Sequence, residues 1–151
     1  MKHFTIMLCV CIVFTGCEQF TPSDQLIRKP SITFNSLPQI AEYTTTRLRY
    51  IPDDADRWQA PQETIERGGG DCEDFCLFVG YFARELGYDV YLVSIDTPEG
   101  SHMILEMNGV YYEAQGVTKF KGIEHYTRTS RESIENALRK CWTVYKSRNA
   151  S

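Results

Sequence analysis

The sequence predicts an α+β domain in which one central apolar helix packs against a small antiparallel sheet. Residues 72 to about 86 form a nearly continuous apolar run, which is typical of a helix buried on most of its circumference. Further on, Asn108-Gly109 separates two segments rich in β-branched and aromatic residues, and this pair is the strongest short signal for a β-hairpin. Helical patterns precede the central run and one more helical pattern follows the strands, so the order favours α+β.

The first 16 residues are expected to be a secretory signal. Lys2 and His3 precede an apolar stretch, residues 4–14, that is too short for a membrane span. The following Phe14-Thr15-Gly16-Cys17 resembles the lipobox of bacterial lipoproteins. That resemblance implies cleavage before Cys17 and attachment of lipid, such as palmitate, to this residue. An ordinary cleaved signal and an uncleaved anchor are the alternatives.

The residue after the lipidated cysteine bears on the location. Residue 18 is Glu, whereas an aspartate there holds many Gram-negative lipoproteins in the inner membrane. We therefore expect a bacterial cell-envelope protein that is anchored to a membrane through Cys17 and faces the periplasm, with the outer membrane slightly favoured.

The composition of the mature chain limits its partners. Removal of residues 1–16 leaves 135 residues, enough for one domain, with fifteen basic and twenty acidic groups and a net charge of −5. No basic stripe is present, which argues against nucleic acid as a partner.

Three thiols remain in an oxidising compartment, Cys72, Cys76 and Cys141. A disulfide between Cys76 and Cys141 would leave Cys72 free, and two reduced core cysteines are the alternative.

The chain before the central helix divides into a tether and two helical segments. Residues 17–35 are polar and contain two prolines, as expected for a flexible tether, and residues 36–151 are expected to form the domain. Residues 36–50 predict a helix capped by Ser36. Pro61 begins a short helix to residue 67, which Gly68 to Gly70 terminate.

Three strands and a last helix are expected after the central helix. The strands are predicted over residues 88–95, 101–107 and 110–115. Residues 116–129 suggest a short strand and a loop, and Ser130 begins a helical pattern that runs to about residue 146.

Cys72 is the residue whose position suggests chemistry. Asp71 precedes it as an N-cap, and Asp74 three residues later completes something close to a capping box. The first-turn amides and the helix dipole then favour a thiolate, and such a thiolate is a typical nucleophile. The neighbouring carboxylates, Asp71 and Glu73 among them, oppose it unless they point away or bind a cation. A buried structural cysteine is the alternative interpretation.

A nucleophilic cysteine needs a base, and the mature chain holds only two histidines. His102 begins the second predicted strand, whereas His125 lies in a polar loop. In a two-residue hairpin centred on Asn108-Gly109, His102 faces Gln115 and lies diagonal to Glu113, and either residue can orient the imidazole.

Several of these residues together resemble one family. Trp58, Pro61, Glu63 and Thr64, the Gly70-Asp71-Cys72-Glu73-Asp74 block, Leu86-Gly87-Tyr88 and the His102 hairpin are similar to the bacterial transglutaminase-like cysteine peptidases. The resemblance covers about residues 55–116. It implies a papain-like core, a helix carrying the nucleophile packed on an antiparallel sheet that carries the base, with Cys72 as nucleophile and His102 as base and acid.

The third catalytic position departs from the family pattern. Relatives usually have Asp there, or Glu followed by Pro, whereas this chain has Tyr112-Glu113-Ala114-Gln115-Gly116. Hairpin register favours Gln115 for this position, whereas Glu113 is the residue that matches the acid of the relatives in chemistry. We prefer Glu113, because a carboxylate stabilises imidazolium. Some relatives bind calcium through acids beside the nucleophile, which Asp71 and Glu73 match. No cofactor is required, and Ca²⁺ is a candidate; a capping Asp71 with a solvated Glu73 is the alternative.

These residues predict acyl transfer from a peptide or protein amide, resolved by water in a peptidase or by a lysine amine in a transglutaminase. A lipid-anchored protein that kept the fold but only binds a peptide or protein partner is the main alternative. Trp58, Tyr111 and Tyr112 would supply aromatic surface for a peptide groove in either case. A zinc site of Cys72, Cys76 and His102 is a weaker alternative, because the usual zinc-ligand spacings are missing.

Overall fold

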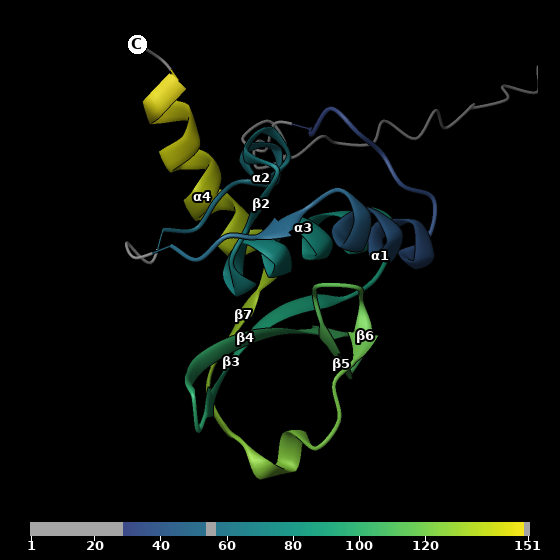
Figure 1. The fold of residues 1–151 in the computed structure, drawn as a ribbon, viewed down its shortest axis with the longest axis vertical. Helices are drawn as coiled ribbons and strands as arrows, with labels where there is room; N and C mark the ends of the chain where they lie inside the picture. The colour runs from purple at the N-terminus through teal and green to yellow at the C-terminus, as the bar shows by residue number, and fades with distance from the viewer. Residues whose placement is uncertain (1–28, 54–56, 150–151) are drawn as a thin grey trace, which may run out of the picture.

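The computed structural model describes residues 29–53 and 57–149, and it confirms the α+β class. Four helices gather on one side of a five-stranded antiparallel sheet whose strand order is β6-β5-β4-β3-β7 (Figure 1). The helices are α1 (Leu37–Thr46), α2 (Pro61–Arg67), α3 (Cys72–Glu85) and α4 (Ile134–Asn149). The sheet strands are β3 (Val90–Thr97), β4 (Gly100–Met107), β5 (Val110–Glu113), β6 (Thr118–Lys119) and β7 (Thr127–Ser133). None of the described helices has the length and apolar character needed to cross a bilayer.

Helix α3 is the centre of the packing, as the apolar run predicts. All its residues from Asp74 to Ala83 are buried, and it contacts the sheet and the other three helices. The capping box is complete, because the Asp71 side chain accepts from the Asp74 N–H and the Asp74 side chain accepts from the Asp71 N–H. Gly80 lets α4 approach closely, since a Cβ there would lie 2.6 Å from Ile134 Cδ1.

The helix expected over residues 36–50 ends earlier, at Thr46. The hydroxyls of Thr44, Thr45 and Thr46 turn back to the carbonyls of residues 41 and 42, a bonding pattern that weakens helix continuation. The chain then extends into β1 (Arg49–Tyr50), which pairs in parallel with β2 (Gly69–Gly70) just before Cys72. Tertiary pairing therefore wins over the helical pattern of the sequence.

The two residues of β2 must be glycine for different reasons. A Cβ on Gly69 would collide with the Arg49 carbonyl of β1, and a Cβ on Gly70 would collide with the Asp74 side chain of α3. Gly69 thus lets β1 pair closely, which brings Tyr50 beside the turn that leads into α3. This is a structural use of glycines 69 and 70 beyond ending α2.

The hairpin forms as predicted. Asn108 and Gly109 both have positive φ angles, 48° and 77°, as a two-residue type I′ turn requires. Leu105 pairs with Tyr112 and Met107 with Val110, which is the register expected from the sequence. The third strand is shorter than predicted, since β5 ends at Glu113.

Strand β7 is a second element that the sequence does not reveal. The last helix begins at Ile134 rather than Ser130, because residues 127–133 pair with β3 at the edge of the sheet. Their polar sequence has no apolar alternation, as is common on edge strands that must not recruit another chain. Arg131 of β7 forms a bidentate ion pair with Glu106 of β4, 2.9 Å for each bond, and its guanidinium stacks over the Tyr91 ring of β3.

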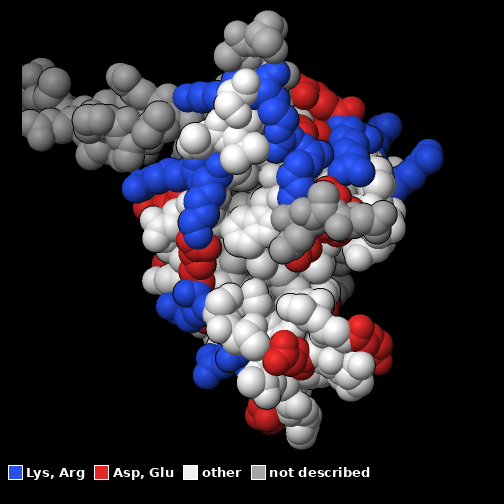
Figure 2. All heavy atoms as spheres, turned by 90° about the vertical axis from the view of Figure 1, so that its left-hand side faces the viewer, with Lys and Arg blue, Asp and Glu red and all other residues white. Residues whose placement is uncertain are grey.

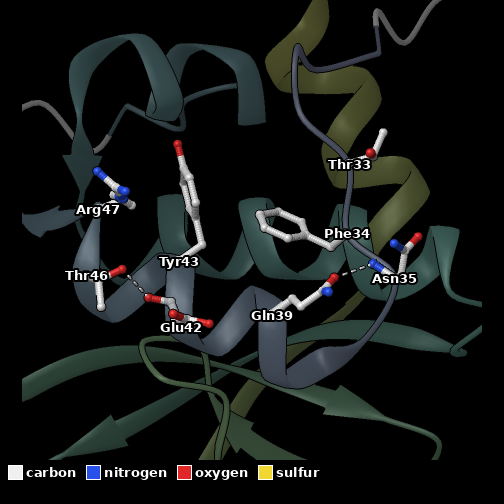
Figure 3. Close-up of a pocket in the computed structure, with 8 residues that line it drawn as sticks. All are labelled: Thr33, Phe34, Asn35, Gln39, Glu42, Tyr43, Thr46 and Arg47. Atoms are coloured by element: carbon white, nitrogen blue, oxygen red, sulfur yellow. Dashed lines mark hydrogen bonds between the residues drawn. The ribbon is translucent and has the colours of Figure 1, made fainter.

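The packed domain begins before residue 36. Phe34 lies within 4.7 Å of Phe82 and 5.4 Å of Tyr43, centroid to centroid, so this end of the expected tether packs on α1 and α3. Figure 3 shows Phe34 and Tyr43 in the hollow between residues 33–35 and α1. The predicted signal over residues 1–16, the expected lipidation site Cys17 and the predicted tether as far as residue 28 lie outside the described residues.

Candidate active site

Cys72 and His102 line one small cavity. Cys72 is the first residue of α3 and is half-buried, and His102 lies near the start of β4. The cavity has a volume of about 70 Å³. The residues that line it with the two are Tyr50, Phe75, Met103, Glu113, Ala114 and Gln115. Thirty residues separate the thiol from the imidazole in the sequence, so only the packing of α3 on the sheet joins them.

The imidazole of His102 contacts Glu113. Its Nε2 lies 3.0 Å from Oε2 and 3.2 Å from Oε1 of that carboxylate. The hydrogen bond with Glu113 raises the pKa of His102 above its usual 6.5, against the opposing effect of burial. Glu113 therefore favours the imidazolium and fixes Nε2, which leaves Nδ1 as the nitrogen available to another group.

Gln115 lies beyond the end of β5 and is exposed, although it lines the same cavity. Among the hydrogen bonds of the described residues, His102 contacts Glu113 and not Gln115. The residue that bonds His102 is thus the one diagonal to it on the hairpin, and β5 ends at this residue, before Gln115. His125 is exposed in η2 (Ile123–His125) and does not line this cavity.

The packing of these helices on the antiparallel sheet occurs in known structures. Legionella pneumophila LapG, treated with EGTA, matches with a TM-score of 0.55 at 18% identity over 80% of this chain and 83% of its own. A second LapG structure matches at 0.53 over 80% and 82%, and the calcium-bound form at 0.50 over 78% and 83%, both at 18% identity. The fold is that of LapG. LapG is a bacterial transglutaminase-like cysteine protease, and at this identity the likeness establishes the fold alone. No protein-family model and no curated protein matches the chain.

Within this LapG-like fold the thiol of Cys72 is held in its neutral form. Its Sγ donates to Glu73 Oε2 at 3.0 Å. Burial and this bond raise the pKa of Cys72 to about 12, although a backbone hydrogen bond with Met103 lowers it. The sequence leaves open whether the flanking acids point away, and the structure shows that Glu73 points at the sulfur. The resting site therefore does not have the thiolate that the helix terminus favours.

The carboxylates around Cys72 repel one another. Burial, then the charges of Asp74 and Glu73, raise the pKa of Asp71 to about 7. Asp74 is fully buried and accepts from the Gln59 backbone N–H at 2.7 Å and from the Gln59 side-chain amide, so its oxygens are engaged. Asp71 and Glu73 are the two acids left to interact with a cation.

This donor set suits a hard cation. The carboxylates of Asp71 and Glu73 are close enough to hydrogen bond, and oxygen ligands of this kind are those that Ca²⁺ prefers. Within residues 29–53 and 57–149, no group of three or more His, Cys, Asp and Glu side chains has the arrangement of a metal site. The remaining ligands would have to be backbone carbonyls and water.

The zinc alternative lacks a second cysteine ligand. Cys76 is completely buried and its Sγ donates to the Met103 carbonyl at 3.3 Å. Cys141 is also buried and reduced, and its Sγ contacts the Leu138 carbonyl, so the alternative of two reduced core cysteines describes this structure.

The sequence does not predict two residues of the site. Tyr50 falls within a helical pattern, yet it lines the cavity of Cys72 from β1; only the two glycines of β2 hint at a neighbouring strand. Gln59 supports Asp74 from the irregular segment between Trp58 and Pro61, and the resemblance assigns no role to this position. The aromatic residues expected in a peptide groove do not line this cavity. Trp58 is near Lys140, Tyr111 packs on the buried cluster of Val93, Ile95 and Ile104, and Tyr112 packs on the core around α3.

Proposed function

We propose that the chain is an acyl-transfer enzyme of the cysteine peptidase kind, acting on a peptide or protein amide through Cys72, His102 and Glu113. The observation that carries the proposal is the shared cavity of Cys72 and His102, with Glu113 on the imidazole Nε2. The fold of LapG supports the same class of reaction.

The chemistry follows from these positions. His102 Nδ1 takes the thiol proton as Cys72 Sγ attacks the carbonyl carbon, and the imidazolium is stabilised by Glu113. The oxyanion accepts from the backbone N–H of Cys72, a first-turn group that has no partner within the helix. Gln115 and Tyr50 line the cavity and carry the donors available for a second bond. His102 then gives its proton to the leaving amine, and water resolves the thioester.

Glu73 opposes this reaction in the resting site, because its bond keeps the Cys72 proton in place. Asp71 and Glu73 would hold Ca²⁺, which would supply positive charge beside the sulfur and compete for the Glu73 carboxylate. We therefore expect calcium to favour thiolate formation.

The test is acylation of the purified full-length chain by p-nitrophenyl acetate, followed by intact-mass and peptide analysis. An acetyl thioester should form on Cys72 and then hydrolyse. Replacement of His102 by Ala should slow its formation by about 100-fold. His125→Ala is the matched control and should react like the parent chain. A chain that forms no adduct at Cys72, or forms one regardless of His102, would refute the proposal.

The neutral thiol favours a second candidate, a protein that uses this cavity to bind a peptide or protein partner without turnover. The two candidates differ in their response to Cys72→Ala. If the chain is an enzyme, this variant should no longer produce the cellular effect of the parent chain, because the nucleophile is gone. If it is a binding protein, the variant should still produce that effect.

We also propose that the domain is held at the cell envelope by lipid on Cys17, facing the periplasm. The signal-like residues 1–16 and the lipobox-like residues 14–17 support this. Metabolic labelling with a palmitate analogue should mark the parent chain and not Cys17→Ser. Equal labelling of the two would exclude this anchor.

A further inference from the structure

A second, larger groove adjoins the cavity of Cys72. It has a volume of about 310 Å³ and shares two lining residues, His102 and Glu113, with that cavity. The other residues that line it are Thr97, Glu99, Ser101, Phe120 and Tyr126. Cys72 does not line it. The base and its carboxylate thus form the wall between the nucleophile and this groove.

The position of the groove defines which part of a substrate it can meet. In the proposed reaction, on which this inference rests, the acyl group stays on Cys72 while His102 protonates the leaving amine. The leaving segment must therefore lie on the side of His102, away from the sulfur. The groove beyond His102 is on that side, so it would contact the segment that follows the cleaved bond.

The lining of the groove suits a cationic side chain. Glu99 lies in the turn between β3 and β4 and is exposed, and no ion pair among the described residues involves its carboxylate. The Phe120 and Tyr126 rings lie 5.5 Å apart, tilted by 53°, and form the apolar wall. Within the described part of the chain, no Lys or Arg lines the groove. An unpaired carboxylate beside two aromatic rings attracts guanidinium and ammonium groups.

The charge distribution of the surface agrees with this assignment. In Figure 2 most Lys and Arg side chains gather in the upper half of the face, over the helices, whereas the lower half carries several acidic side chains and fewer basic ones, at its left edge. The end of the β3–β4 hairpin belongs to the lower, sheet side of the molecule (Figure 1).

We propose that this groove is the binding site for the leaving-group segment of the substrate, and that it selects an Arg or Lys side chain through Glu99, Phe120 and Tyr126. In the reverse direction the same site takes an amine acceptor that carries a cationic side chain, since both meet the acyl carbon from the side of His102. The substrate class is therefore a peptide with a basic residue just after the cleaved bond.

The acceptor reaction tests the proposal without a known substrate. The full-length chain is acetylated on Cys72, and argininamide or citrullinamide, which has a neutral side chain of the same length, is added. The α-amine attacks the thioester carbon, the C–N bond forms and the C–S bond breaks. The amine proton passes through His102 to the sulfur, and the acetylated amide is released. We expect argininamide to be acetylated about five- to tenfold faster than citrullinamide.

Two variants locate the preference. Glu99→Gln should reduce the ratio of the two rates to about 2 or less, the share that the aromatic wall contributes. Glu124→Gln removes the same charge from the neighbouring η2, outside the groove, and should keep the parent ratio. Equal rates for the two amines in the parent chain, or a preference that Glu99→Gln leaves unchanged, would overturn the proposal.

The outcome remains separable from the test of the proposed function. If Cys72 forms no thioester, the proposed reaction fails, and binding to the groove is measured directly by NMR. Argininamide that shifts the amide signals of Thr97, Ser101 and Tyr126 more strongly than citrullinamide supports a cation site. Shifts that are absent or equal for the two probes refute it.

Discussion

Replacement of Glu73 by Gln should make Cys72 more reactive. The Glu73 carboxylate accepts from Sγ at 3.0 Å, and this bond holds the proton on the thiol. A hydrogen bond to a charged group contributes about 1.5 to 3 kcal/mol. Because Cys72 is half-buried, solvent screening favours the lower end, about 1.5 kcal/mol, which corresponds to a fall of about 1 in the pKa. Burial remains in the variant, so the pKa stays above that of a free thiol.

The assay is the rate of alkylation by iodoacetamide between pH 7 and 10. A pKa lower by about 1 gives about tenfold more thiolate below the pKa, and the weaker nucleophile reduces the gain to about threefold in rate. Peptide mapping separates Cys72 from the buried Cys76 and Cys141. Glu42→Gln, which removes one exposed charge from α1, should leave the rate unchanged. Added Ca²⁺ should increase the alkylation rate of the parent chain by a larger factor than that of the Glu73→Gln variant.

The reasoning would be refuted by a parent chain whose Cys72 already titrates below the ordinary range of a thiol, near 8.5. An unchanged or slower rate in Glu73→Gln would refute it as well, since the Glu73 bond would then not hold the proton.

Three further substitutions test Asp71, the contact of Glu113 with His102, and Gly70. The raised pKa of Asp71, about 7 against 3.8, means that the folded state binds more protons between these values, so stability falls as pH rises through this window. Asp71→Asn keeps a capping oxygen and should stabilise the fold by about 1 to 2 kcal/mol at pH 8. In denaturant melts, the stability of this variant should depend less on pH than that of the parent chain. An equally steep dependence would contradict this. Glu113→Gln should lower the pKa of His102 toward 6.5 in an NMR titration. In the parent chain the stabilisation from this pair is present below about pH 6.5 and lost as pH rises through the raised pKa, and an unmoved titration would exclude the contact. Gly70→Ala should destabilise the domain by about 2 kcal/mol or more, because its Cβ displaces the Asp74 cap; a neutral effect in urea melts would show that β2 can shift.

The features that the sequence predicts correctly are local. The capping box of Asp71 and Asp74 depends on residues three positions apart, and the hairpin register depends on the two turn residues Asn108 and Gly109. Each follows from backbone geometry within a few residues, so no knowledge of distant contacts is required. The apolar run after Cys72 likewise predicts a central helix, because a helix that is apolar on most of its circumference is stable only when it is buried.

The features that the sequence misassigns depend on partners far along the chain. Residues 127–133 have no strand pattern and become β7 only because β3 offers an open edge. Tyr50 leaves its helical pattern because Gly69 and Gly70 accept β1 alongside them. Pairing energy in a sheet comes from the neighbouring strand, which a local pattern does not contain.

The sequence by itself determined the place of Cys72 at the N-terminus of α3, the hairpin that carries His102, and a choice of Glu113 or Gln115 beside it. Tertiary structure decided three things: which of the two contacts His102, that Cys72 and His102 share a cavity, and that Glu73 turns toward the sulfur. Helix caps and tight turns are set by bonds between near neighbours. The direction of a side chain and the pKa of its group are set by whatever the fold packs around it.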